Sequence, residues 1–224
     1  MESKLNIDIN EVLRYLGYKG QNIEKELIEQ INNLIYECKN LIRSKYVYRE
    51  FNLLKEDKNI LLEGTKLILK GNDITNLLKE SDRCVLMAVT IGTDIERKIK
   101  LYSKSNLTKS IILDACASTA VEEVCDKVQE IIIKDVLKGE EKFTFRYSPG
   151  YGDLPLDIQK DFISILDCER KIGLKVSNEM ILFPRKSVTA IVGINSSKKI
   201  NKKCEECNNY ERCNYKREAK KCGC

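Results

Sequence analysis

The strongest constraint on the fold is an almost continuous apolar run at residues 83–91, with the sequence RCVLMAVTI. A strand with one face in water alternates apolar and polar residues, and this run does not. The run is therefore most simply a strand that is buried on both faces. Gly92 ends it, and Thr93-Asp94-Ile95-Glu96 then has the pattern of a capping box that opens a helix.

Further strands and helices follow from the periodicity of the apolar residues. We expect strands at residues 47–51, 60–62, 66–69, 143–147, 180–183 and 187–194, with a hairpin turn at Glu63-Gly64. We expect helices at residues 9–16, 23–42, 74–79, 108–134 and 158–166, besides the one that follows Thr93. These elements mix without a regular β-α-β rhythm. The pattern favours an α/β (α+β) fold, in which helices pack on a mixed or antiparallel twisted sheet.

The candidate binding residues lie in one stretch, Arg146-Tyr147-Ser148-Pro149-Gly150-Tyr151-Gly152-Asp153-Leu154-Pro155. Residues 143–147 alternate apolar and polar side chains as a strand does, and Pro149-Gly150 breaks that strand. Arg146 offers a fixed fork of donors that suits a carboxylate, and Gly150 lets the backbone approach a ligand closely. Tyr151 adds a flat amphipathic ring. The stretch fits a pocket for a small carboxylate-bearing molecule; the alternative is a strand end followed by an ordinary Pro-Gly turn.

This region resembles the activation domain of cobalamin-dependent methionine synthase, which binds S-adenosylmethionine (AdoMet). Arg146, Gly150 and Tyr151 match the R-x-x-x-G-Y signature of that family. The next residues keep the family's order: a loop with proline, a helix at residues 158–166, Glu169-Arg170-Lys171-Ile172-Gly173-Leu174, and Phe183-Pro184-Arg185-Lys186-Ser187-Val188-Thr189. The close match covers residues 110–194. The chain departs from the family at Ser177-Asn178-Glu179, where Thr-Glu-Ser is usual, and at Ile200-Asn201, where tyrosines are usual.

The resemblance implies an AdoMet site in which Arg146 holds the methionine carboxylate. The backbone around Ser148 and Gly150 then contacts the rest of the ligand, and Tyr151 borders it. In the family, AdoMet and one electron from an external reductant convert inactive cob(II)alamin back to methylcobalamin. The chain contains no recognisable corrinoid, folate or homocysteine module. It is therefore expected to act in trans, as a component of methionine synthase activity. Its expected partners are a corrinoid-containing methionine synthase, which holds the cobalamin, and an electron donor such as flavodoxin or ferredoxin.

The composition excludes several other classes of function. The chain has no histidine, which excludes histidine acid–base chemistry, histidine-containing nucleophilic dyads and histidine metal ligands. The net charge of +5 lies in residues 196–224, so we expect no basic globular surface that wraps nucleic acid. No apolar run approaches the roughly 18 residues of a membrane span, and the N-terminus lacks a signal-peptide pattern. We expect a cytoplasmic protein without a membrane partner.

Five of the ten cysteines lie in the last 21 residues: Cys204, Cys207, Cys213, Cys222 and Cys224. Because thiols in a reducing compartment rarely form disulfides, we expect these cysteines to bind a metal centre, either zinc or an iron–sulfur cluster. The spacing does not decide between the two, and redox-active or disordered cysteines are the alternative. The C-x3-C-x2-C pattern of radical-AdoMet enzymes is absent. The other cysteines lie singly in apolar patterns and are expected in the core (Cys38, Cys84, Cys116, Cys125 and Cys168).

These patterns divide the chain into three parts. Residues 1–107 form an N-terminal helical and strand region of the same fold, and residues 108–195 form the AdoMet-binding region with the R-x-x-x-G-Y motif. Residues 196–224 form a short, basic, cysteine-rich C-terminal tail after a polar linker. Two other functions stay open at this point. One is an AdoMet-responsive binding module without methyl transfer, and the other is a zinc knuckle that binds nucleic acid through the basic tail.

Overall fold

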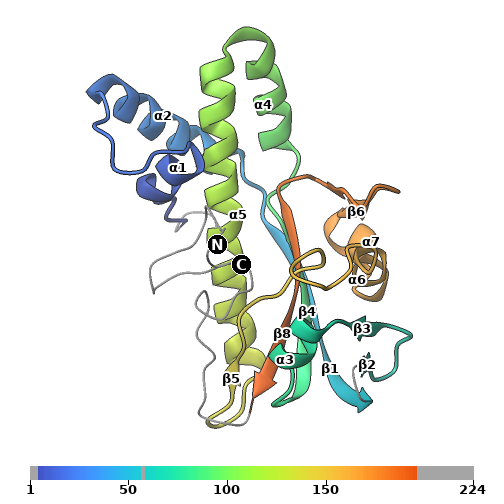
Figure 1. Cartoon of the computed structure of the whole chain (residues 1–224). Helices are drawn as coiled ribbons and strands as arrows, with labels where there is room; N and C mark the ends of the chain where they lie inside the picture. The colour runs from blue at the N-terminus through green and yellow to red at the C-terminus, as the bar shows by residue number, and fades with distance from the viewer. Residues whose placement is uncertain (1–4, 57–58, 196–224) are drawn as a thin grey trace. The chain divides into compact units, whose positions relative to one another are not determined.

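The computed structural model describes residues 5–56 and 59–195 (Figure 1). The chain forms two compact units, each built from three separate segments. The described residues of the first unit are 5–46, 89–128 and 181–188, and those of the second are 47–56, 59–88, 129–180 and 189–195. The domain boundaries expected at residues 107 and 195 stay a prediction. The cysteine-rich tail lies outside the described residues.

The second unit contains most of a six-stranded sheet with the strand order β3-β2-β1-β4-β8-β5. Its strands are β1 (Lys45–Glu56), β2 (Asn59–Leu62), β3 (Ile68–Lys70), β4 (Ser81–Thr90), β5 (Lys142–Phe143) and β8 (Ser187–Asn195). β1 pairs with β2, β2 with β3, and β5 with β8, in each case antiparallel. Figure 1 shows β1, β4 and β8 side by side. The predicted α/β (α+β) fold, a mixed or antiparallel sheet with packed helices, is confirmed.

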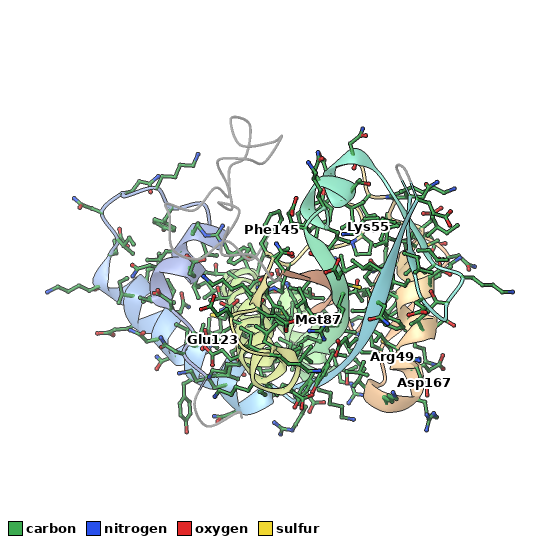
Figure 2. All side chains as sticks on the ribbon, turned by 90° about the horizontal axis from the view of Figure 1, so that it is seen from below. Arg49, Lys55, Met87, Glu123, Phe145 and Asp167 are labelled. Carbon is green, nitrogen blue, oxygen red and sulfur yellow. The ribbon has the colours of Figure 1, made fainter. Side chains whose placement is uncertain are left out.

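β4 is the strand that the apolar run predicts, and it is buried on both faces. Every residue from 84 to 90 is buried, and Met87 has no exposed surface; Figure 2 shows Met87 among packed side chains. The second unit also contains α3 (Asn72–Leu77), α6 (Gln159–Ile165), α7 (Cys168–Ile172) and β6 (Lys175–Val176). The three helices bury large side chains, and Phe162 and Ile74 are fully buried. Burial of one such side chain stabilises the fold by about 1.5–3 kcal/mol.

The first unit is mainly helical. It contains α1 (Ile9–Tyr15), α2 (Lys25–Leu41), α4 (Asp94–Ser105), the part of α5 (Leu107–Val136) up to residue 128, and β7 (Leu182–Phe183). α4 and α5 form a helical hairpin (Figure 1), in which the Asn106 side-chain oxygen accepts a hydrogen bond from Lys109 N at 3.0 Å and so caps α5. Among the described residues, no helix is long and apolar enough to cross a membrane.

Three local predictions differ from the structure. β1 extends to residues 45–56, well beyond the predicted 47–51. The strand predicted at residues 180–183 shortens to β7, because Met180 adopts a left-handed conformation (φ 62°) in a turn closed by a bond to Ser177 O. The capping box at Thr93 does not form. Thr93 precedes α4 without a side-chain cap, and Glu96 Oε1 instead accepts from Lys186 N at 3.1 Å.

An ion pair ties the turn before β5 to the sheet. Arg83 Nη2 on β4 donates to both carboxylate oxygens of Glu141 at 2.7 Å, and the two side chains are only 20% and 19% exposed. The hydrogen bond from Arg83 lowers the pKa of Glu141 below its ordinary value. Because the folded pKa lies below the unfolded one, the pair stabilises the fold above about pH 4.3, and this stabilisation disappears as the pH falls through the folded pKa.

We expect Glu141→Gln to lower the free energy of unfolding by about 1 kcal/mol near pH 7. The difference from the wild type should be smaller at pH 3 than at pH 7, because Glu141 loses its charge as it becomes protonated with falling pH. Urea unfolding of the two proteins at both pH values measures this. Glu130→Gln, at an exposed position on α5, is the matched control and should change little. If Glu141→Gln lowered the free energy of unfolding equally at the two pH values, the role given to the ion pair would be contradicted.

Candidate functional site

The segment that leads into the R-x-x-x-G-Y motif is not the regular strand that its alternation predicts. β5 ends at Phe143, which pairs with Ile194, and the next pairing with β8 is Tyr147 with Ile191. Between these pairs the motif segment advances four residues while β8 advances three. The extra residue is a β-bulge, which re-aims the side chains that follow it.

The bulge places polar side chains on the buried side of the segment. Thr144, Arg146 and Tyr147 are 8%, 6% and 9% exposed, whereas Phe145 (labelled in Figure 2) is only half-buried. A strict alternation would instead place Phe143, Phe145 and Tyr147 together on one face of the strand. The reason lies on β8: Gly193 N donates to Thr144 Oγ1 at 2.9 Å, and a Cβ on Gly193 would come within 3.0 Å of Thr144 Cγ2.

The Arg146 side chain is buried in the fold rather than open to solvent. Its Nη1 donates to Oε1 of Gln129, on the last part of α5, at 3.0 Å. Burial weakens the solvent screening of the guanidinium, so an anion beside it would interact more strongly than at an exposed arginine. The Gln129 side-chain oxygen accepts one hydrogen bond of the guanidinium and so restricts its orientation. The pair is therefore suited to hold a carboxylate in one orientation.

The residues after Arg146 form a tight turn. Tyr151 N donates to Ser148 O at 3.1 Å, and Gly150, the third residue of this turn, has φ +88°. Proline second and glycine third are the residues that a type II turn prefers. Gly150 N also donates to Leu154 O at 3.0 Å. The sequence assigned Gly150 to close approach of a ligand, but the positive φ requires glycine here even without a ligand.

Tyr147 holds the turn against the sheet. Its hydroxyl donates to Tyr151 O at 3.1 Å, and its ring centroid lies 6.2 Å from that of Tyr151. The Tyr151 side chain remains 46% exposed, and Gly150 is exposed as well. The motif therefore combines a buried cation with an accessible aromatic ring and accessible backbone.

Asp153 anchors the far end of the same loop. Its carboxylate accepts hydrogen bonds from Asn72 N at 2.5 Å and from Asp73 N at 3.1 Å, the first two residues of α3. α3 begins after Gly71, which has no side chain that could cap it. Asp153 therefore caps α3 from 80 residues away in the chain and fixes the loop to the helix.

We expect Asp153→Ala to lower the free energy of unfolding by about 1 kcal/mol, because both backbone donors lose their partner. Asp153→Asn should cost less, since the asparagine oxygen is also a good cap. Thermal unfolding of the two variants beside the wild type measures the difference. Equal losses in both variants would show that the carboxylate charge, not the cap, matters here.

Arg146, Ser148, Gly150 and Tyr151 lie in one short segment, and their binding role stays a prediction. Three further residues hold this segment in place. Gln129, Tyr147 and Asp153 position the motif, and local sequence gives little sign of their roles. Gln129 lies near the end of a long helix, and Asp153 acts on a helix that precedes it by 80 residues. Only the spacing of Tyr147 and Tyr151, four apart around a Pro-Gly turn, hints at their contact.

The described residues contain no group of three or more acidic, cysteine or histidine side chains that could hold a metal. The five single cysteines are buried as predicted, and burial raises the pKa of the Cys116 and Cys168 thiols to about 12. Such thiols stay protonated at neutral pH and make poor metal ligands. The predicted ligands Cys204, Cys207, Cys213, Cys222 and Cys224 lie outside the residues that the structure describes.

A comparison with protein-family models identifies the family. The model for the activation domain of vitamin B12 dependent methionine synthase matches residues 70–214, more than half of the chain. The chain belongs to this family. The match to the activation domain contains the whole R-x-x-x-G-Y motif as well as Gln129 and Asp153. It also reaches Cys204, Cys207 and Cys213, whereas Cys222 and Cys224 lie beyond it.

A solved structure supports the fold of this activation domain. The crystal structure of the MetH reactivation domain bound to AdoHcy matches with a TM-score of 0.64 and 12% sequence identity, over 83% of this chain and 73% of that one. At this identity the likeness shows a shared fold. Among the curated proteins, none matches the chain significantly.

Proposed function

We propose that this chain binds AdoMet at the loop after Arg146 and supports the reductive methylation of cob(II)alamin on a separate, corrinoid-containing methionine synthase. The observation that carries the proposal is the buried Arg146 guanidinium, oriented by Gln129 and followed directly by the Gly150 turn. The family match covers these residues. The structural relative bound to AdoHcy supports the ligand class, because AdoHcy is AdoMet without its transferable methyl group.

Each motif residue has a part in this proposal. Arg146 holds the carboxylate of the methionine moiety through charge-assisted hydrogen bonds. The backbone of Ser148 and Gly150 contacts the ligand, and the exposed Tyr151 ring borders it. When bound, AdoMet supplies the methyl group, so this chain contributes binding and orientation rather than acid–base chemistry. The sequence contains no histidine, which agrees with a protein that binds and orients its ligand without acid–base chemistry.

The proposal also names the partners. The cobalamin is held by the methionine synthase, on which this chain acts in trans in the cytoplasm. The electron comes from a donor protein such as flavodoxin or ferredoxin. The cysteines of the tail are the proposed ligands of a zinc ion or an iron–sulfur cluster.

The decisive experiment mixes this protein with the corrinoid methionine synthase of the same organism in its cob(II)alamin form. With AdoMet and a reductant present, the cobalamin spectrum should change to that of methylcobalamin. The change should require this chain and AdoMet together. AdoMet binding without any change in the spectrum would favour a regulatory AdoMet module instead.

A further inference from the structure

The first unit carries an open groove of about 300 Å³, and all of its lining residues belong to that unit. Tyr15 and Leu16 at the end of α1 form one wall, Ile99 on α4 forms a second, and Ile111 and Ala115 on α5 form a third. The volume lies at the lower end of the range for ligand pockets. It is enough for one or two aliphatic side chains.

The polar groups in the groove already have partners within the protein. Ser110 Oγ donates to Ile99 O at 3.0 Å, and Ser118 Oγ donates to Asp114 O at 3.0 Å. Asp114 Oδ1 pairs with Lys186 Nζ at 2.9 Å. Because these groups are satisfied, a polar ligand would gain little by replacing their partners. The groove is therefore better suited to an apolar side chain.

The tip of the α4–α5 hairpin, beside the groove, has basic but no acidic side chains. Residues 97–113, which we name the basic hairpin, contain five lysines and arginines and no acidic residue. Lys98 pairs with Glu37 at 2.9 Å, whereas Lys100 and Lys104 are exposed and have no ion-pair partner in the described part of the chain. These two lysines stand four residues apart and share one face of α4.

Three large apolar side chains are exposed on the same hairpin. Leu101 is 57% exposed, Leu107 64% and Ile111 53%. Leu107 and Ile111 are four residues apart on one face of α5, and Ile111 also lines the groove. An apolar centre with charged residues around it is the usual composition of a protein–protein interface. Nucleic acid alone would leave these apolar side chains without a partner.

The charge of the basic hairpin limits what can cover it. The chain's own tail, residues 196–224, carries a net charge of +5 and would be repelled. A second copy bound symmetrically would place one basic hairpin against another. The partner that remains is an acidic protein surface with an apolar side chain that enters the groove.

We propose that the groove and the basic hairpin bind an acidic amphipathic helix of a partner protein. Its apolar face lies on Leu107 and Ile111 with one side chain in the groove, as in other helix-in-groove complexes. Its acidic residues face Lys100 and Lys104 and increase the association rate. The proposal does not depend on AdoMet binding, because none of these residues belongs to the proposed AdoMet site.

The test uses the full chain and a labelled, 16-residue helical probe peptide of roughly four to five turns. The peptide has leucines at helical spacing and glutamates elsewhere, and a second peptide has lysines in place of the glutamates. By fluorescence anisotropy, we expect the glutamate peptide to bind and the lysine peptide not to bind. Raising the salt from about 50 to about 300 mM should weaken binding. Lys100→Glu with Lys104→Glu, and separately Ile111→Ser, should each weaken it by about tenfold or more.

Lys66→Glu with Lys70→Glu, at exposed positions in the second unit, is the matched control and should bind the glutamate peptide like the wild type. The substituted residues of the hairpin and groove are exposed, and circular dichroism confirms that each variant is folded. The proposal is overturned if neither peptide binds, if both bind equally, or if the charge reversal has no effect. It is also overturned if Ile111→Ser abolishes a dimer seen by ultracentrifugation, which would assign the surface to a second copy. Binding to phosphatidylglycerol vesicles but not to the glutamate peptide would assign it to lipid.

Discussion

Arg146→Ala should weaken AdoMet binding about ten- to a hundredfold. A hydrogen bond to a charged group contributes about 1.5–3 kcal/mol, and the loss of this energy corresponds to that change in affinity. The burial of Arg146 (6% exposed) and its bond to Gln129 place the expected effect towards the upper end, because a buried charge interacts strongly. Isothermal titration calorimetry of the wild type and the variant measures it.

Two further variants separate the carboxylate contact from packing. Arg146→Met keeps an unbranched stem of similar length in the buried site and removes only the guanidinium, so it should bind as weakly as the alanine variant. Gln129→Ala leaves the charge in place but no longer orients it, so it should have a smaller effect. No AdoMet binding by the wild type would remove the proposed function. Normal affinity of Arg146→Met would leave AdoMet binding intact but remove Arg146 from the site.

Deletion of residues 200–224 should remove the metal of the protein completely. The anaerobically purified full chain should contain about one zinc, or about four irons with matching sulfide, because four thiolates are the usual ligand set for either centre. AdoMet affinity should stay nearly unchanged, since the proposed AdoMet residues all precede the tail. Elemental analysis and calorimetry measure the two quantities on the same samples.

Matched substitutions within the tail sharpen this test. Cys204→Ser with Cys207→Ser should lose the metal, and Asn208→Ala with Asn209→Ala should keep it. If the centre is iron–sulfur, the deletion should also slow corrinoid methylation with a physiological reductant, and a strong artificial reductant should restore the rate. A metal-free full chain with five freely titrating tail thiols would refute the metal site.

Local periodicity was enough to predict the main elements of the fold. The apolar run at residues 83–91 became β4 because a strand with no polar face has to be buried on both sides. The long helix predicted at residues 108–134 became α5 at Leu107–Val136. The hairpin at Glu63-Gly64 joins β2 to β3 as expected. These predictions succeeded because each depends on neighbours within a few residues.

The sequence by itself determined the family, since the R-x-x-x-G-Y signature and the blocks after it are contiguous patterns. It also determined which residues could take part in the site. Only the tertiary structure decided how they are used. The packing buries Arg146 and Thr144 through a bulge against β8. It gives Arg146 a hydrogen-bond partner 17 residues away in sequence, Gln129, and it gives α3 a cap 80 residues or more away, Asp153. Such pairings depend on which backbone and side-chain groups meet when the sheet and helices pack. No pattern of neighbouring residues encodes contacts between residues so far apart in the sequence.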